Sequence, residues 1–140
     1  MASDDWLAEV SWTKDNVFLG SDTKGHTVVY DSSDEVPRGI GPMRALLTSL
    51  GACGGMDVVA ILKKRKQRLR TLKIQLTGER PAHGLPKPWK AIHMKYILSG
   101  DGLQKKYVEE AVKESTEKFC SVGATLSPTA KITWSYEIEP

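Results

Sequence analysis

One long segment, residues 42 to 67, constrains the fold of this 140-residue chain more than any other. Apolar or small side chains recur there at intervals of three and four residues, which is the spacing of one helix face. Pro42 suits the first turn of a helix, because its missing N–H would have no partner there in any case. The segment is apolar or small on most faces through Leu62. We therefore predict a central, buried helix.

Three glycines interrupt this predicted helix, at Gly51, Gly54 and Gly55. Each weakens an isolated helix by roughly 1 kcal/mol relative to alanine. We therefore expect a compensating reason for them, which is either the close approach of another backbone or room for a ligand.

Before this helix, alternation of apolar and polar side chains predicts three short strands. They fall near residues 6–12, 17–22 and 26–31, and turn-forming sequences separate them. This arrangement is typical of a small antiparallel meander.

After the helix, the same alternation predicts strands near residues 72–77, 92–98 and 132–138. An amphipathic pattern predicts a second helix near residues 108–119. The resulting order, β-β-β-α-β-β-α-β, indicates an α+β fold with two main helices on one face of largely antiparallel sheets. The length fits a single domain that spans residues 1–140.

The chain begins with acidic residues and shows no signal peptide. No segment approaches the roughly 20 apolar residues that span a membrane. We therefore expect a cytoplasmic protein without a membrane partner.

A basic run, KKRKQRLR at residues 63–70, carries much of the net charge of +3. Such a run is typical either of a nucleic-acid site or of a helix end, where cations complement the negative pole of the helix dipole. The run closes the predicted helix and has no aromatic residue beside it. We favour the helix end and expect no nucleic-acid partner.

The two cysteines, Cys53 and Cys120, are too few for a disulfide-stapled secreted fold. Cys53 lies inside the predicted helix, where a thiol often packs as a small apolar side chain. If it reacts instead, it needs a cation from elsewhere in the fold or from a partner subunit, because Asp57 one turn later would raise its pKa. The scattered histidines and the cysteine spacing match no metal-binding motif, so we expect no metal.

Two stretches carry a resemblance to a known family: GPMRALLTSLGACGGMDVVAILKKRK, followed by LTGER, and AVKESTEKFCSVGATLSPTAKITWSYEI. They resemble the OsmC/Ohr family of organic hydroperoxide reductases, and most closely its YhfA-like branch. The resemblance covers roughly residues 6 to 139. It implies the OsmC-like fold and an intertwined homodimer with two sites at the subunit interface.

The resemblance also implies roles for the two cysteines. Cys53 corresponds to the peroxidatic cysteine and Cys120 to the resolving cysteine, which together reduce an organic hydroperoxide. An external dithiol, from a lipoyl protein or a thioredoxin-like protein, would then restore both thiols. This chemistry requires no cofactor.

The chain departs from the family pattern at the residues that stabilise the thiolate. Family members carry an arginine in a turn after the first strand, where this chain has TKDN, so that Lys14 is the nearest match. They also carry a glutamate where this chain has Met43 and Arg44. Arg38 and Arg44 are the other candidate cations, although each also fits a solvated arginine. The alternative function is therefore a non-catalytic protein that binds a small apolar ligand at the dimer interface.

Overall fold

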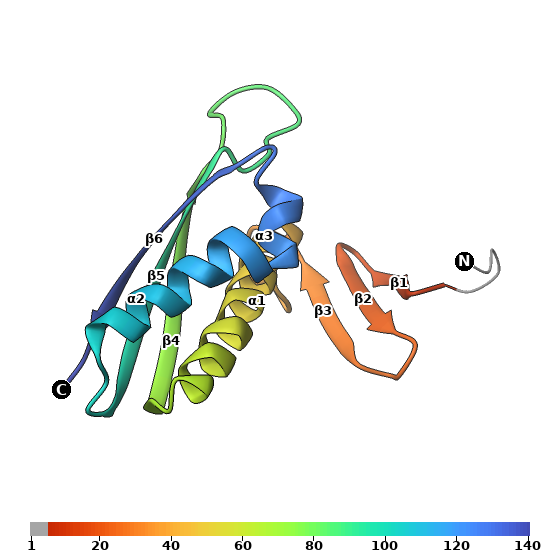
Figure 1. Cartoon of the computed structure of the whole chain (residues 1–140). Coiled ribbons are helices and arrows are strands. Elements are labelled where there is room, and N and C mark those ends of the chain that lie inside the picture. The colour runs from red at the N-terminus through yellow and green to blue at the C-terminus, as the bar shows by residue number, and fades with distance from the viewer. Residues whose placement is uncertain (1–5) are drawn as a thin grey trace. The chain divides into compact units, whose positions relative to one another are not determined.

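The computed structural model describes residues 6–140. The acidic start of the chain, on which the signal-peptide argument partly depends, falls at residues 1–5 and lies outside the described residues. The chain forms two compact units, Met1–Leu46 and Leu47–Pro140 (Figure 1). The single domain over residues 1–140 stays a prediction.

The first unit contains the predicted three-stranded meander. Its strands are β1 (Ala8–Lys14), β2 (Val17–Asp22) and β3 (Thr27–Asp31), which pair antiparallel in the order β1-β2-β3. Strand β1 begins two residues later than the alternation starting at Trp6 had indicated. The meander prediction is otherwise confirmed.

A buried carboxylate organises the loop after β3. Asp31 is 1% exposed and accepts hydrogen bonds from the backbone N–H groups of Arg38, at 2.9 Å, and Ser33, at 3.0 Å. The Arg38 guanidinium lies 3.4 Å from Asp31 and 3.3 Å from Asp15. Hydrogen bonds from two backbone N–H groups lower the pKa of Asp31 to about 2. The bond from Arg38 has the larger effect, and the bond from Ser33 has the second largest.

The long predicted helix is α1 (Pro42–Lys64), which ends three residues before the predicted end. Lys66 has a φ of 57°, which is left-handed backbone. The N–H of Gln67 bonds the carbonyl of Leu62, and the N–H of Lys66 bonds that of Lys63. These two bonds form a Schellman motif, which closes the helix without a glycine.

The basic run divides between two elements. Lys63 and Lys64 occupy the last turn of α1, which confirms the helix-end interpretation for these two residues. Later in the run, Arg65 pairs with Glu110, and Arg70 lies 3.5 Å from Asp101. Two of its arginines therefore take part in ion pairs within the chain.

The second unit has a three-stranded mixed sheet in the order β4-β5-β6. Its strands are β4 (Arg68–Glu79), β5 (Ala91–Asp101) and β6 (Lys131–Ile138). Strands β4 and β5 pair antiparallel, whereas β6 pairs parallel with β5. The parallel pair arises because the chain returns to the sheet through a helical crossover. The α+β prediction is confirmed.

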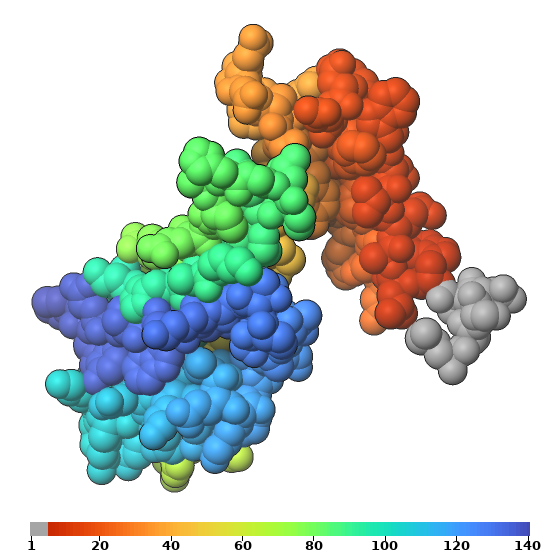
Figure 2. All heavy atoms as spheres, turned by 90° about the horizontal axis from the view of Figure 1, so that it is seen from above, coloured from red at the N-terminus to blue at the C-terminus, as the bar shows by residue number. Residues whose placement is uncertain are grey.

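The predicted second helix is three elements: α2 (Lys105–Glu114), a π-helical turn η1 (Ser115–Phe119) and α3 (Ser121–Leu126). The π turn was not expected. Phe119, its last residue, falls at the end of the predicted amphipathic helix and is 55% exposed. In the space-filling view, α2 and the C-terminal segment, coloured cyan to dark blue, lie on one surface of this unit (Figure 2).

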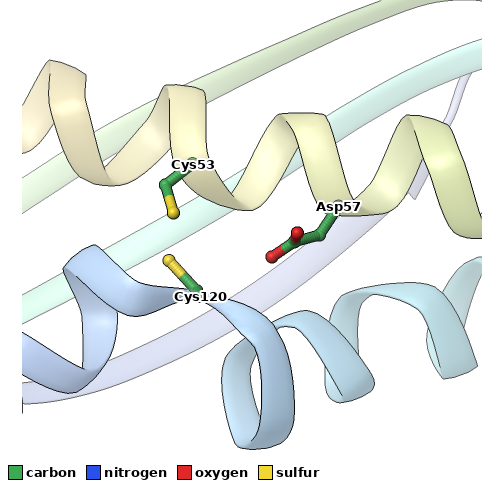
Figure 3. A group of neighbouring side chains, drawn as sticks. All are labelled: Cys53, Asp57 and Cys120. Carbon is green, nitrogen blue, oxygen red and sulfur yellow. The ribbon is translucent and has the colours of Figure 1, made fainter.

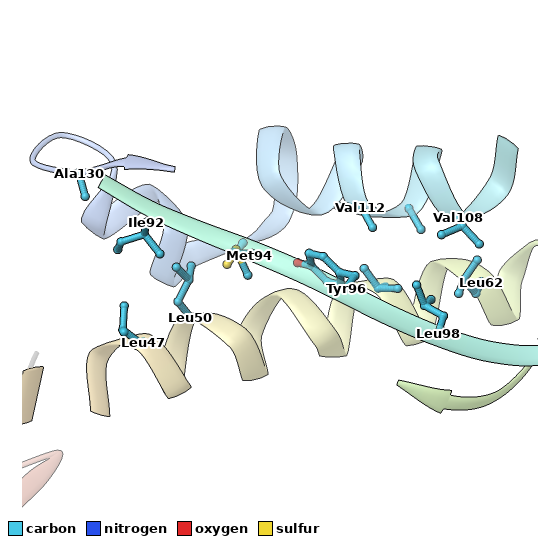
Figure 4. Packing of buried hydrophobic residues seen from close by; sticks show 13 residues of the cluster. Leu47, Leu50, Leu62, Ile92, Met94, Tyr96, Leu98, Val108, Val112 and Ala130 are labelled. Atoms are coloured by element: carbon cyan, nitrogen blue, oxygen red, sulfur yellow. The ribbon is translucent and has the colours of Figure 1, made fainter. Parts of the chain in front are cut away.

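The core of the second unit lies between the helices and strand β5, the central strand of the sheet (Figure 4). By length and composition α1 is apolar enough to cross a membrane, contrary to the sequence expectation. One face of it, however, is buried in this core, which is the arrangement of a core helix. The main buried side chains are Leu50, Val58 and Leu62 of α1, Ile92, Met94, Tyr96 and Leu98 of β5, and Val108 and Val112 of α2.

The glycines of α1 allow the side chains of the sheet to approach the helix closely. A Cβ at Gly54 would lie 2.4 Å from the Tyr96 hydroxyl, and one at Gly51 would lie 2.9 Å from Leu76 Cδ1. Gly55 is less restricted, because a Cβ there would meet the ends of two flexible side chains, Ile74 Cδ1 at 3.1 Å and Leu72 Cδ2 at 3.8 Å. The close neighbours are therefore side chains of the sheet rather than another backbone.

We expect Gly54→Ala to lower the free energy of unfolding by about 1–3 kcal/mol, the usual cost of overpacking a core. Gly55→Ala is the matched control and should change stability less. Adding Tyr96→Phe to Gly54→Ala should recover part of the loss, because it removes the clashing hydroxyl. Denaturant unfolding gives the free energy of unfolding of the wild type, the two alanine variants and the double variant. Equal effects of the two alanine variants, or no recovery, would contradict this packing.

We also expect Asp31→Asn to destabilise the protein in a pH-dependent way. The pKa of Asp31 is about 2 when folded, against an ordinary value of 3.8, so its stabilisation is complete above about pH 4 and is lost as pH falls through about 2. Unfolding measured across this range should show the variant and the wild type converging in acid. Asp34→Asn, on the same loop but exposed, is the control. A difference that does not change with pH would contradict the assignment.

Candidate thiol site

Helix α1 presents Cys53 and Asp57 on one face, because residues four apart lie one turn from each other. Both side chains are half-buried and point toward the segment that contains Cys120 (Figure 3). The packing of Gly54 against Tyr96 fixes the rotation of the helix and therefore this facing.

Cys120 is held at the junction between the π turn and α3. Its backbone N–H bonds the Ser115 carbonyl at 2.8 Å, which closes the π turn. Its Sγ accepts a hydrogen bond from the backbone N–H of Gly123 at 3.3 Å. π turns are rare and often occur at functional sites.

These two elements bring the cysteines together. The Sγ atoms of Cys53 and Cys120 and a carboxylate oxygen of Asp57 all lie within 4.8 Å of one another. Both cysteines are free thiols in the structure, and their sulfur atoms point toward each other (Figure 3). Two residues that are far apart in the sequence therefore share one site.

The surroundings of the two thiols differ. Cys120 is 6% exposed, and burial is the main cause that raises its pKa to about 11. The neighbouring Cys53 and Asp57 raise the pKa of Cys120 further, while the hydrogen bond from Gly123 acts in the opposite direction. Cys120 is therefore protonated at neutral pH, and the half-buried Cys53 is the more accessible sulfur.

Ser115 and Tyr96 belong to the same site, although neither was predicted there from the sequence. Ser115 is 1% exposed, and its Oγ donates to Asp57 Oδ2 at 2.8 Å. The Tyr96 hydroxyl is buried and has no hydrogen-bond partner at normal geometry within residues 6–140. Burial is the main cause that raises the pKa of Tyr96 to about 12, with smaller effects from Cys120 and Asp57. A protonated hydroxyl therefore lies at the site, and the Ser115 side chain beside it lowers its pKa slightly.

A cavity of about 330 Å³ opens beside Cys120. Tyr96, Ser115 and Gly54 line it together with Cys120, and Lys131 and Ile132 of β6 form another part of its wall. It has room for several water molecules or a small organic molecule. The cavity borders Cys120, whereas Cys53 is not among its lining residues.

The three predicted cations belong to the first unit, and the cysteines belong to the second. Lys14 is the last residue of β1, and Arg44 lies in the first turn of α1. The Arg38 side chain pairs with Asp15 and Asp31. The role of the three cations as partners of the thiolate stays a prediction.

Comparison with known proteins agrees with this fold. A family model described as OsmC-like protein matches residues 33–135. Protein YhfA of Escherichia coli K12 is 36% identical over 133 residues, which cover 94% of this chain and 96% of YhfA. The chain therefore belongs to the OsmC-like protein family.

Solved structures show the same fold. A hypothetical protein from Aquifex aeolicus VF5 has a TM-score of 0.80 and 36% identity, over 95% of this chain and 96% of that one. An organic hydroperoxide resistance protein, OsmC of Legionella pneumophila, has a TM-score of 0.71 and 13% identity, over 98% and 99% of the two chains. The second likeness, at this identity, concerns the fold alone.

We expect alkylation to separate the two thiols. At neutral pH, iodoacetamide should modify Cys53 well before Cys120, because Cys120 is buried and its pKa is about 11. Asp57→Asn removes a charge that raises the pKa of Cys120, so Cys120 should react at lower pH in that variant. Peptide mass mapping across a pH series gives both rates.

The control for this experiment is Asp101→Asn, which changes an exposed aspartate elsewhere in the same unit. Cys120 that reacts as fast as Cys53 at neutral pH in the wild type would contradict the described difference between the thiols.

Proposed function

We propose that this protein reduces organic hydroperoxides with Cys53 and Cys120 as a redox-active thiol pair. The proximity of the two sulfur atoms, within 4.8 Å in a chain of the OsmC-like family, carries the proposal. A solved structure with the same fold is named an organic hydroperoxide resistance protein, which supports the choice of substrate class.

In the first step, the Cys53 thiolate attacks one oxygen of the peroxide O–O bond. That bond breaks, Cys53 becomes a sulfenic acid, and the alkoxide takes a proton and leaves as an alcohol. Cys53 is assigned this role because it is half-buried, whereas Cys120 is buried and its pKa of about 11 disfavours the thiolate.

In the second step, the Cys120 sulfur attacks the Cys53 sulfenic acid. A disulfide forms and water leaves, which protects Cys53 from further oxidation. An external dithiol, from a lipoyl or thioredoxin-like protein, then exchanges with this disulfide and is itself oxidised. Each cycle converts one hydroperoxide and one dithiol into an alcohol, water and a disulfide. A cytoplasmic location suits these steps, because thiols stay reduced there.

The proposal includes a homodimer. Helix α1 and strand β4 line an apolar groove, and on the exposed side of α1 Met56 is 72% and Val59 46% exposed. Large exposed apolar surfaces of this kind mark interfaces. A cation that stabilises the Cys53 thiolate is then supplied by Lys14, Arg38 or Arg44, from the same chain or from the partner subunit.

A second candidate function uses the same groove. Its lining, from α1 and from Leu72, Ile74 and Leu76 of β4, is almost wholly apolar. A non-catalytic protein that binds a small apolar ligand at the dimer interface would have this feature. This binding function would not explain why the two sulfur atoms lie together.

Titration of the reduced protein with cumene hydroperoxide, without oxygen, tests the proposal. We expect each chain to lose both free thiols and about two mass units, the two hydrogens removed when a disulfide forms. Cys53→Ser should abolish turnover with a dithiol. Cys120→Ser should still react and should accumulate a sulfenic acid at Cys53, detected by dimedone labelling.

Ser121→Ala, which changes the residue next to Cys120 and leaves both thiols, is the matched control and should keep the wild-type rate. Thiols that stay unreacted at millimolar peroxide would overturn the peroxidase and favour the binding protein. Dimedone on Cys120 in the Cys53→Ser variant, with turnover retained, would reverse the two roles.

A further inference from the structure

The thiol site has a third member, Asp57, which the peroxide chemistry does not use. Its carboxylate lies within 4.8 Å of both sulfur atoms, so that two thiols and a carboxylate converge from two elements (Figure 3). The sequence could not reveal this set as a metal site, because 67 positions separate the two cysteines.

The distances fit a metal ion of the zinc type. Zn–S bonds are about 2.3 Å long, and Zn–O bonds about 2.0–2.2 Å. In a tetrahedral site, two thiolates on one Zn²⁺ are therefore about 3.8 Å apart. The three ligand atoms, at no more than 4.8 Å from one another, need only small side-chain movements to reach these positions.

The donor set suits a thiophilic divalent ion. Two thiols supply the thiolate ligands that Zn²⁺ prefers, and the Asp57 carboxylate supplies an oxygen ligand. Such an ion binds by displacing the thiol protons.

Surrounding hydrogen bonds already orient two of the ligands. Ser115 Oγ donates to Asp57 Oδ2, which leaves Oδ1 available, and the Gly123 N–H donates to Cys120 Sγ. Such outer contacts are typical of metal sites. The cavity beside Cys120 provides room for a water as fourth ligand, and the unpartnered Tyr96 hydroxyl borders that cavity.

We propose that the reduced protein binds one thiophilic divalent ion, of which Zn²⁺ is the model, through Cys53, Asp57 and Cys120. Binding converts both thiols to metal-bound thiolates and releases two protons. While the ion is bound, the sulfur electron pairs are engaged in metal–sulfur bonds, so the disulfide cannot form. The site thus has two exclusive states, metal-bound and oxidised.

The test is a titration of the reduced full-length protein with Zn²⁺ against a chromophoric chelator, without oxygen or peroxide. We expect one ion per chain and about two protons released near neutral pH. Co²⁺ in place of Zn²⁺ should give thiolate-to-metal charge-transfer absorption. Cys53→Ser and Cys120→Ser should each weaken binding at least about 100-fold, and Asp57→Asn about 10- to 100-fold.

Asp101→Asn, an exposed aspartate in the same unit, is the matched control and should bind as the wild type does. The protein oxidised to the disulfide should not bind, which tests the site without any substitution. Equal binding by reduced and oxidised protein, or no binding by reduced protein, would overturn the inference. Because peroxide is absent, thiols that bind Zn²⁺ but resist cumene hydroperoxide would refute only the peroxidase, and the reverse result only the metal site.

Discussion

The packing of α1 against strand β5 is the contact on which the site depends. At Gly54 the helix has no side chain, and the Tyr96 hydroxyl occupies the space that a Cβ would take. This contact sets the rotation of the helix about its axis. Cys53 and Asp57, one before and three after this glycine, consequently face the segment that carries Cys120 (Figure 3). A different rotation would direct the thiol elsewhere.

The second requirement is the π turn before Cys120. If residues 115–119 formed a regular α-helix, they would extend α2, and Cys120 would be one more residue of that helix. Instead the turn closes with a bond from the Cys120 N–H to the Ser115 carbonyl. Ser115 is thereby buried beside Asp57, and Cys120 turns toward α1. The same five residues thus position both the Cys120 sulfur and Ser115, the hydrogen-bond partner of the Asp57 carboxylate.

The elements that depend on side-chain periodicity could be predicted from the sequence, because burial imposes a period of two on strands and of three to four on helices. The alternation in residues 92–98 identified the central strand β5, and the long apolar segment identified α1. The Schellman motif that ends α1 could not be predicted, because its left-handed position is Lys66, where a glycine is usual. The π turn has no pattern of its own in the sequence.

The residues of the candidate site also fall into those that could be predicted from the sequence and those that could not. The two cysteines were predicted from a family resemblance, and the fold brings them together. The sequence treated Asp57 only as an influence on a thiol pKa and gave Ser115 and Tyr96 no role at the site, since their approach depends on contacts between distant segments. The cations Lys14, Arg38 and Arg44 belong to the other unit, and Arg38 already pairs with Asp15 and Asp31.

The central claim is that Cys53 and Cys120 of one chain form a single redox site. Peptide mapping of the fully oxidised protein without reduction, on a mixture of isotopically light and heavy chains, tests it most directly. The structure predicts one linked peptide pair, Cys53 to Cys120, with both peptides from chains of the same isotope. Links between two copies of the same cysteine, pairs of mixed isotope, or complete oxidation without a disulfide would contradict it.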